Sequence, residues 1–466
     1  MQRLNVLNPR PSGSRLAASP NLDLHERQVV LVGLDWSRDK DPRLPLGQAS
    51  LTASLVTRGA LVHNLSYGIN QPTFTLTAVI DEVLARAAVS PDTWADVGIG
   101  VYVWNDALVQ GLCRGLRERG YRGRIILGGP QITYHGPGVA ASYPDADAFV
   151  RGAGEEALSA IVGEDDRARP TGVVWRGEAD PCEQAVVELD RLPSPYLQGT
   201  LDPARHRRFL RWETRRGCLF RCSFCQHRDP GSRPQVQGFA LDRTTREIAA
   251  FVAARVESIA VLDPIFNDPR SPYLEILDAL IAAGFRGHLS LQCRFELVTP
   301  EFLDRCRHLD VTLEFGLQTI HPAEWAVVRR GNHLGKIDAA IAALHQAELD
   351  FEVSLIYGLP EQTLASFRET VDWCLHRRIP TVRAFPLMLL RGTELERARG
   401  RWGLRESDDV IPRVIAGNTF TEQEHAEMSR IAEALLATEG HHPGSVVELY
   451  DGWSGPLDLR RWTPAA

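Results

Sequence analysis

One stretch decides the fold, namely Arg216-Gly217-Cys218-Leu219-Phe220-Arg221-Cys222-Ser223-Phe224-Cys225, which follows a strand-like run at 209–214. It places three cysteines within eight residues. Three thiolates this close together can hold one compact cluster of irons. A [4Fe-4S] cube takes four ligands, for which thiolate is the usual protein group. Three protein ligands therefore leave one iron open, and an open iron can chelate a small molecule through an amine and a carboxylate.

A zinc site is the alternative explanation of these cysteines. Zinc sites usually pair a C-x₂₋₄-C unit with a second pair of ligands downstream, and His227 is available as one of these. The C-x₃-C-x₂-C spacing, with the aromatic Phe224 before the last cysteine, instead resembles the motif of the radical S-adenosylmethionine (SAM) superfamily. This resemblance implies that Cys218, Cys222 and Cys225 bind a [4Fe-4S] cluster and that SAM binds its open iron.

Length and composition set the broad class of the protein. A chain of 466 residues with 44% hydrophobic content is expected to form two or three domains. It has no run of 18 apolar residues, and its first 26 residues are polar without a signal peptide, so we expect a cytoplasmic soluble protein with no membrane partner. A net charge of −7 leaves no basic field for nucleic acid. Five scattered cysteines suit a reducing compartment better than a disulfide framework.

After a tail at 1–27, residues 28–163 alternate between strand-like and helix-like runs. The strand-like runs lie at 29–33, 60–65, 97–103, 124–127 and 148–150, and the helix-like runs at 47–58, 75–88 and 107–119. Continuous apolar strands separated by helices predict a doubly wound parallel sheet, an α/β Rossmann-like domain. Such sheets bind ligands at the carboxyl ends of their strands.

The expected strand ends of this domain carry an aromatic residue and several glycines. They are Trp104, Gly128, Gly129, Gly152 and Gly154. Glycine lets a ligand approach the backbone closely. No G-x-x-x-x-G-K-[ST] motif occurs, so a P-loop is excluded, and no G-x-G-x-x-G opens the first helix, so a nicotinamide site is poorly supported.

Taken in order, these segments resemble the cobalamin-binding-type domain that precedes many radical SAM cores. The resemblance implies a corrinoid cofactor, with the five residues above as candidate contacts. The D-x-H-x-x-G motif that supplies a histidine ligand to cobalt is absent, because the position has Asp35-Trp36-Ser37-Arg38-Asp39. A domain that only scaffolds the core is the alternative.

Residues 164–208 are charged and contain prolines, and we expect an extended linker there. From 209 to 400 six strand-like runs alternate with helix-like runs, which predicts a partial (β/α)₆ TIM-type barrel with its chemistry at the C-terminal ends of the strands. The remaining segment, 401–466, is expected to be helical, and it either packs on the barrel or forms a lid. Its helix begins at Thr421, with Glu424 completing a capping box.

Polar residues follow successive strands of the expected barrel. SAM carries an ammonium, a sulfonium and a carboxylate, so it needs acceptors for its cations and a donor for its anion. By resemblance to the superfamily, Asp263 and Asn267 would contact the amino group, Arg294 the carboxylate, and Glu314 and Gln318 the ribose and methionine parts. The turn at Gly358 would lie near the adenine.

These resemblances imply an enzyme that uses a [4Fe-4S] cluster, SAM and cobalamin. The reduced cluster would cleave SAM to a 5′-deoxyadenosyl radical, and an electron donor such as flavodoxin or ferredoxin would reduce the cluster. We expect a cobalamin-dependent methyltransferase that acts on a small molecule or natural-product intermediate. One alternative is transfer of the 3-amino-3-carboxypropyl group of SAM, as in the arsinothricin-forming enzymes whose acceptor is trivalent arsenic. Another is a non-catalytic iron-sulfur or corrinoid sensor.

Overall fold

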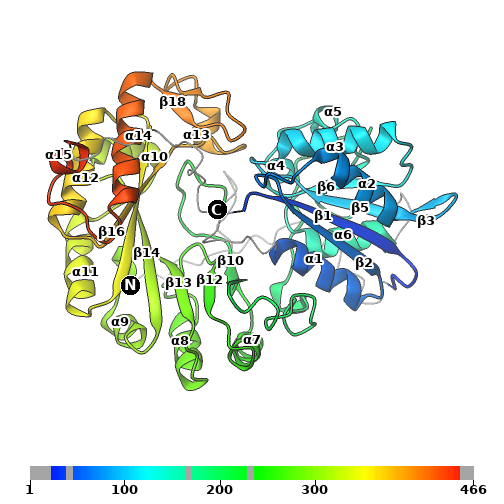
Figure 1. Cartoon of the computed structure of the whole chain (residues 1–466), viewed down its shortest axis with the longest axis horizontal. Coiled ribbons are helices and arrows are strands. Elements are labelled where there is room, and N and C mark those ends of the chain that lie inside the picture. Colours follow the sequence, from blue (N-terminus) through cyan, green and yellow to red (C-terminus); the bar gives the residue numbers. More distant parts are fainter. Residues whose placement is uncertain (1–22, 38–45, 164–168, 228–235, 452–466) are drawn as a thin grey trace, which may run out of the picture.

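A computed structural model of the chain describes residues 23–37, 46–163, 169–227 and 236–451. Its two main sheets have six strands each and form separate α/β halves, the N-terminal half in blue and cyan and the later half in green to orange (Figure 1). The predicted fold class is confirmed in both halves. No helix among the described residues is long and apolar enough to span a membrane.

The N-terminal sheet has the strand order β2-β1-β5-β6-β7-β8. Its strands are β1 (Gln28–Asp35), β2 (Leu61–Gly68), β5 (Asp96–Gly100), β6 (Ile125–Gly128), β7 (Ala148–Val150) and β8 (Val173–Trp175). The first five pair in parallel, because a helix follows most of them and carries the chain back across the sheet. A small antiparallel pair, β3 (Ala88–Ser90) and β4 (Thr93–Trp94), extends from it.

Helices cover both faces of this sheet. On one face α1 (Leu46–Thr57) and α6 (Gly154–Gly163) bury Leu55 and Ile161 against the strands. On the other face α2 (Leu76–Ala87) and α3 (Asp106–Glu118) bury Val83 and Leu112. The short helices α4 (Pro130–Thr133) and α5 (Val139–Ser142) follow β6. This two-sided cover explains why the central strands β1, β6 and β7 are mostly apolar rather than alternating, whereas only Leu65 is buried in the edge strand β2.

The sheet extends into the segment that the sequence predicted as a linker. Strand β8 pairs antiparallel with β7, and Gly152 forms an isolated bridge with Ala185. The strand was not predicted because its apolar run, Val173-Val174-Trp175, is only three residues long and lies among prolines and charged residues. The covalent connection between the two halves therefore begins later than predicted, after a strand that belongs to the first domain. Residues 164–168 lie outside the described part.

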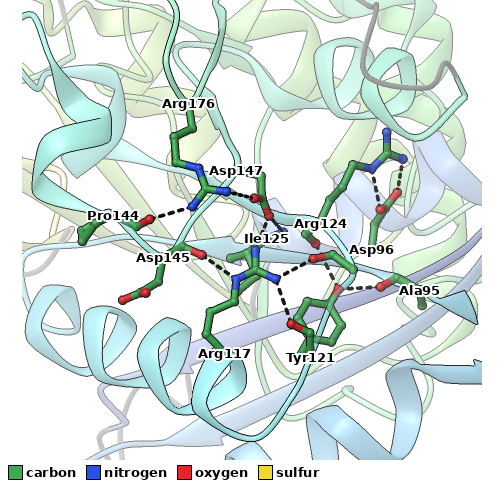
Figure 2. Close-up of polar contacts among 11 residues, drawn as sticks. Ala95, Asp96, Arg117, Tyr121, Arg124, Ile125, Pro144, Asp145, Asp147 and Arg176 are labelled. Carbon is green, nitrogen blue, oxygen red and sulfur yellow. Dashed lines mark hydrogen bonds and ion pairs between the residues drawn. The ribbon is translucent and has the colours of Figure 1, made fainter. Parts of the chain in front are cut away.

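Arginine and aspartate side chains tie together the amino ends of β5, β6 and β7 (Figure 2). Arg117 donates to the carbonyls of Asp145, Tyr121 and Gly123 over 2.9–3.0 Å and pairs with Asp147. Arg124 holds both oxygens of Asp96 at 2.6–2.7 Å. A hollow of about 380 Å³ beside them is lined by Arg122, Gly123, Arg124, Asp147, Arg169, Trp175, Arg176 and Glu178. It lies at the edge opposite the one where parallel sheets bind ligands.

The second sheet has the order β16-β15-β14-β13-β12-β9, and all its strands are parallel. The strands are β9 (Leu210–Trp212), β12 (Ser258–Val261), β13 (His288–Cys293), β14 (Asp310–Gln318), β15 (Asp350–Tyr357) and β16 (Thr381–Pro386). The helices α7 (Leu241–Ala253), α8 (Tyr273–Ala282), α9 (Pro300–Cys306), α10 (Pro322–Val328), α11 (Leu334–Gln346) and α12 (Leu364–His376) lie along its outside (Figure 1). The predicted six-stranded partial barrel is confirmed.

Side chains alternate across these strands. In β13, Leu289, Leu291 and Cys293 are buried in the core, while Ser290 and Gln292 are only half-buried. Gln292, Glu314 and Glu352 pair in one row across β13, β14 and β15. Because successive side chains of a strand point to opposite faces, the concave face of the sheet carries a polar row.

The predicted C-terminal helix is α14 (Glu422–Ala437), and its capping box between Thr421 and Glu424 is present. Met428, Ile431 and Leu435 are buried in the same core as the barrel strands, so α14 is part of the helical layer beside β16. The elements α13 (Glu394–Arg397), β17 (Arg405–Glu406), β18 (Val414–Ala416) and α15 (Val446–Asp451) complete this segment. Trp453 and Trp462 lie outside the described residues.

Candidate active site

The cysteine loop begins directly after β9 and the short strand β10 (Arg215–Arg216), which pairs with β11 (Gln237–Gly238). It therefore follows the carboxyl end of the first barrel strand, where TIM-type barrels carry their chemistry. Cys218, Cys222 and Cys225 are half-buried free thiols. Burial raises the pKa of Cys218, and it raises that of Cys225 to about 12. A bound metal deprotonates such thiols outright.

The middle of the loop is fixed by the barrel. The Ser223 N–H donates to the carbonyl of Val328 at 3.0 Å, and its hydroxyl donates to that of Val327 at 3.0 Å. The N–H of Leu395 donates to the Ser223 carbonyl at 2.9 Å. The loop is thus attached to the end of α10 and the start of α13.

The three thiols do not have the arrangement of a mononuclear site. Among the described residues no group of three or more His, Cys, Asp or Glu side chains is gathered as a single ion requires. Zinc holds thiolates at about 2.3 Å in a tetrahedron, so its ligands must nearly touch, whereas a cube spreads its thiolates over separate irons. His227 approaches Cys225 through its backbone N–H, 3.5 Å from the sulfur. A donor set of three thiolates fits a [4Fe-4S] cluster with one open iron.

Guanidinium groups surround the loop. Arg330 donates to the sulfur of Cys222 at 3.9 Å. Arg294 lies 3.8 Å above the ring of Phe220 and donates to the Gly331 carbonyl at 2.7 Å. Arg215 is buried and pairs with Asp268 at 3.1 Å. Burial and the neighbouring Arg330 lower the pKa of Arg294.

Some of these groups are not satisfied by the protein. None of the described residues accepts from Nε or Nη1 of Arg215, or from Nε of Arg330. A buried N–H without an acceptor costs about 1–3 kcal/mol, and an anionic ligand removes that cost. Thiolate ligands make an iron-sulfur cluster more negative, and SAM adds a carboxylate, so this cationic lining fits both groups. Arg215 directly precedes the cysteine motif in the sequence, whereas only the fold brings Arg330 to it, and the sequence predicted a ligand contact for Arg294 alone.

Asp263 and Asn267 support the loop through protein contacts. The Asp263 carboxylate accepts from the N–H groups of Thr214 and Arg215 at 2.8 and 3.2 Å and from the Thr214 hydroxyl. Burial raises its pKa to about 6. Asn267 exchanges two bonds of 2.9 Å with the backbone of Arg294. Both residues lie at the predicted strand end, and their contact with SAM stays a prediction.

Glu314 and Gln318 occupy different depths in the barrel. Strand β14 continues to Gln318, so Glu314 lies four residues before its carboxyl end rather than at the end expected from the sequence. Glu314 accepts from the Ser290 hydroxyl and neighbours Glu352, which pairs with Arg383 at 3.1 Å. Burial raises the pKa of Glu352 to about 7. Glu314 thus belongs to the polar row inside the barrel.

Gln318 lies at the mouth of the barrel. Its φ is +70°, a left-handed conformation that is uncommon outside glycine, and the pairing of β14 with β15 shifts at Gly316 and Gln318. Its side-chain oxygen is buried, and no described residue donates to it. An unsatisfied amide at a strained strand end is a strong candidate for a ligand contact.

The turn at Gly358 is closed by Gln362, whose side-chain oxygen accepts from the N–H groups of Gly358 and Leu359 at 2.7 and 3.2 Å. Gly358 has φ +84°, which favours glycine. His425 of α14 packs against this turn, and burial lowers its pKa to about 4. No sequence motif marks His425, because it reaches the barrel through the packing of α14.

The residues predicted for a corrinoid lie at the carboxyl edge of the N-terminal sheet. Trp104 stacks on Tyr102 with a centroid distance of 4.6 Å, and it donates to the Leu34 carbonyl at 3.1 Å. A Cβ on Gly128 would approach no other residue closer than 3.7 Å. The internal packing does not require a glycine there, which suits a cofactor surface.

The other glycines serve the protein's own turns. Gly129 and Gly152 have φ values of +92° and +80°. A Cβ on them would lie 2.8 Å from the Val101 carbonyl and 2.5 Å from the Ala185 carbonyl, respectively. On Gly154 it would lie 3.1 Å from Leu51. Their corrinoid contacts stay predictions, since turn geometry already explains Gly129 and Gly152.

The two carboxyl edges face each other across direct contacts. Arg391, which follows β16, donates to Asp106 at 3.2 Å, to the Gln131 carbonyl at 2.9 Å and to the Tyr143 hydroxyl at 3.3 Å. The Tyr134 hydroxyl donates to the carbonyl of Gln226, next to Cys225. The cysteine loop and the candidate corrinoid surface thus lie at one interface.

Residues 212–374 match the radical SAM superfamily. The chain therefore contains a radical SAM domain over these residues. It is 32% identical over 384 residues to the cobalamin-dependent radical SAM methyltransferase TokK of Streptomyces tokunonensis, covering 76% of this chain and 54% of TokK. It is also 32% identical over 277 residues to the 2-(S-pantetheinyl)-carbapenam-3-carboxylate methyltransferase of Streptantibioticus cattleyicolor, covering 55% of this chain and 38% of that enzyme. The chain spans about half the length of the first relative and less of the second.

Solved radical SAM structures share both halves of the fold. The methyltransferase TsrM from Kitasatospora setae, solved with cobalamin and a [4Fe-4S] cluster, superimposes with a TM-score of 0.66 at 18% identity, over 82% of this chain and 78% of TsrM. The cobalamin-dependent radical SAM enzyme OxsB, solved with aqua-cobalamin and SAM, gives 0.65 at 15% identity, over 89% of this chain and 67% of OxsB. At these identities the likeness concerns the fold.

Proposed function

We propose that this protein is a cobalamin-dependent radical SAM methyltransferase acting on a small molecule or natural-product intermediate. The observation that carries the proposal is the position of the cysteine loop, which meets the carboxyl edge of the N-terminal sheet through Arg391 and Tyr134. Two cofactors bound at these edges would share one substrate space. The names of the curated relatives support the same activity.

When bound, the cluster supplies the electron that cleaves SAM, and cobalamin supplies the methyl group. Cys218, Cys222 and Cys225 would hold the cluster. Arg215 and Arg330 would offset its negative charge with the N–H groups that the described protein leaves unsatisfied. Arg294 and Gln318 would orient SAM at the barrel mouth, beside the turn at Gly358.

On the N-terminal side, the Tyr102–Trp104 stack and Gly128 would form the surface against the corrinoid. The Trp104 indole donates to the carbonyl of Leu34 near the end of β1 and is thereby fixed in orientation. No histidine from a D-x-H-x-x-G motif is available to the cobalt, so we expect absorption and paramagnetic resonance spectra of a cobalamin without that ligand.

The products derived from SAM test the activity. Methylation that uses one SAM as methyl donor and another as radical source yields S-adenosylhomocysteine and 5′-deoxyadenosine in near-equal amounts. Methylthioadenosine as the main nucleoside, with no cobalamin uptake, would contradict methylation and favour 3-amino-3-carboxypropyl transfer. 5′-Deoxyadenosine alone would indicate a rearrangement. A protein that binds the cluster but never consumes SAM would be a sensor.

We also propose that a reduced flavodoxin or ferredoxin delivers the electron and that the protein acts in the cytoplasm, away from membrane and nucleic acid. Free cysteines and an iron-sulfur cluster both suit a reducing compartment. Turnover that dithionite supports but neither reduced carrier supports would contradict this choice of donor.

A further inference from the structure

The first cysteine is preceded by an arginine that reaches the N-terminal domain. Arg216 lies two residues before Cys218, and its Nε is 2.9 Å from both carboxylate oxygens of Glu213. Its Nη2 donates to Glu155 at 2.6 Å. Glu155 stands in the first turn of α6, and its side chain is 7% exposed. The start of the cysteine loop is therefore held by a partly buried ion pair from the other domain.

The last cysteine is followed by a second connection. Gln226 is adjacent to Cys225, and its carbonyl accepts from the Tyr134 hydroxyl. Its side-chain amide donates to the Arg391 carbonyl at 2.8 Å, and Arg391 in turn bonds to Asp106. The end of the loop is thus tied to the N-terminal domain directly and through Arg391.

We propose that the N-terminal domain sets the geometry of the iron-sulfur loop, with Arg216 and Gln226 as the positioning residues at its two ends. This inference rests on the cluster of the proposed function and adds a structural role for the N-terminal domain that does not depend on cobalamin. The barrel holds the loop at Ser223 and at Arg215, and the interface adds contacts through Arg216 and Gln226, close to Cys218 and Cys225. Ligand orientation and hydrogen bonding tune the properties of a metal centre.

Two conservative comparisons test this role. Tyr134→Phe removes only the hydroxyl that bonds to Gln226, and its matched control is Tyr121→Phe, whose hydroxyl bonds to the Ala95 and Arg124 carbonyls inside the N-terminal domain (Figure 2). Glu155→Ala removes the partner of Arg216. Its control is Asp96→Ala, which removes the partner of Arg124 within the same domain.

The readouts are the paramagnetic resonance spectrum of the reduced cluster and the rate of iron loss to a ferrous chelator, both without SAM or cobalamin. Tyr134→Phe and Glu155→Ala should each change the spectrum and release iron roughly fivefold faster, as expected for loss of one hydrogen bond that restrains the loop. The double variant should be more affected than either. Glu155→Gln, which keeps an acceptor for Arg216, should restore part of the wild-type behaviour. The two controls should match the wild type.

A double variant with the wild-type spectrum and iron-release rate would overturn the inference and leave the proposed function standing. Altered cluster behaviour in a protein that never forms S-adenosylhomocysteine would support the inference while contradicting methylation. A wild-type protein that holds no cluster would contradict both.

Discussion

Arginines gather at the cysteine loop and at the amino ends of β6 and β7, and the two groups differ in what their nitrogens meet. In the second region Arg117 and Arg124 are paired with carboxylates and backbone carbonyls of the same domain (Figure 2). At the loop, Arg215 and Arg330 keep buried N–H groups for which the described protein supplies no acceptor. Charge density and a hollow therefore do not identify the site here, whereas unsatisfied buried donors beside the cysteine motif support it.

The largest expected effect is loss of the cluster, which should follow substitution of a cysteine in the loop but not of one beside the arginine network. Cys222→Ala should abolish the cluster, because one of only three protein ligands is lost. Reconstituted wild-type protein should hold about four irons and absorb near roughly 400 nm. The matched control is Cys113→Ala, since Cys113 lies in α3 beside the arginine network and burial raises its pKa to about 12. A cluster that survives loss of Cys222 would disprove the assignment.

The next effect concerns the arginine that contacts a ligand sulfur. Arg330→Ala should lower the reduction potential of the cluster, because a cationic donor to Cys222 favours the more negative, reduced state. A donor worth about 1.4 kcal/mol corresponds to about 60 mV for one electron. Arg117→Ala, at the opposite edge, should leave the potential unchanged. Potentiometric titration measures the cluster potential of both variants. A potential in Arg330→Ala equal to that of the wild type would show that Arg330 does not act on the cluster.

Much of this organisation was predictable from the sequence, because periodicity and glycine placement report local structure directly. The six strands of the barrel sheet lie within a few residues of their predicted bounds, and the α14 cap begins at the predicted threonine. The depth of a side chain was not predictable in the same way. Glu314 was placed at a strand end because the apolar run stops near Phe315, but parallel pairing with β15 carries the strand on to Gln318.

Long-range contacts explain the remaining misses. Arg216 is one of many arginines in the sequence, and only the fold brings it to Glu155, 61 residues earlier. Gln226 and Tyr134 are 92 residues apart. No local pattern marks such pairs, since each residue type is ordinary in a loop. Strand β8 was missed for a different reason, because three apolar residues among prolines and charges are too few to establish a period.

A third effect distinguishes the mouth of the barrel from its interior. Gln318→Ala should weaken SAM binding roughly fivefold, the loss of one neutral hydrogen bond. Glu314→Gln should change SAM affinity by less than about twofold, because Glu314 already bonds to Ser290 inside the barrel. Equilibrium binding of SAM to the reconstituted protein measures both. A larger loss of SAM affinity in Glu314→Gln than in Gln318→Ala would support Glu314 as the SAM contact and assign Gln318 a structural role.

The smallest effect tests whether burial keeps a proton on Glu352 in the polar row inside the barrel. Burial raises the pKa of Glu352 to about 7, against an ordinary value of 4.5, even though Arg383 pairs with it. The folded protein therefore binds this proton more tightly than the unfolded chain does. The stability that the protonated form contributes is fully present below about pH 4.5 and is lost as the pH rises through about 7.

Glu352→Gln cannot ionise. The difference in stability between variant and wild type should therefore move in the variant's favour as the pH rises from about 5.5 to 8, on the order of 1 kcal/mol or about 2 °C in Tm. Glu118→Gln, an exposed change in α3, should show no such drift. A constant difference across this range would mean that Arg383 keeps Glu352 ionised, and that the interior row is a balanced ion pair in the same way as the arginine network at the opposite edge of the N-terminal sheet.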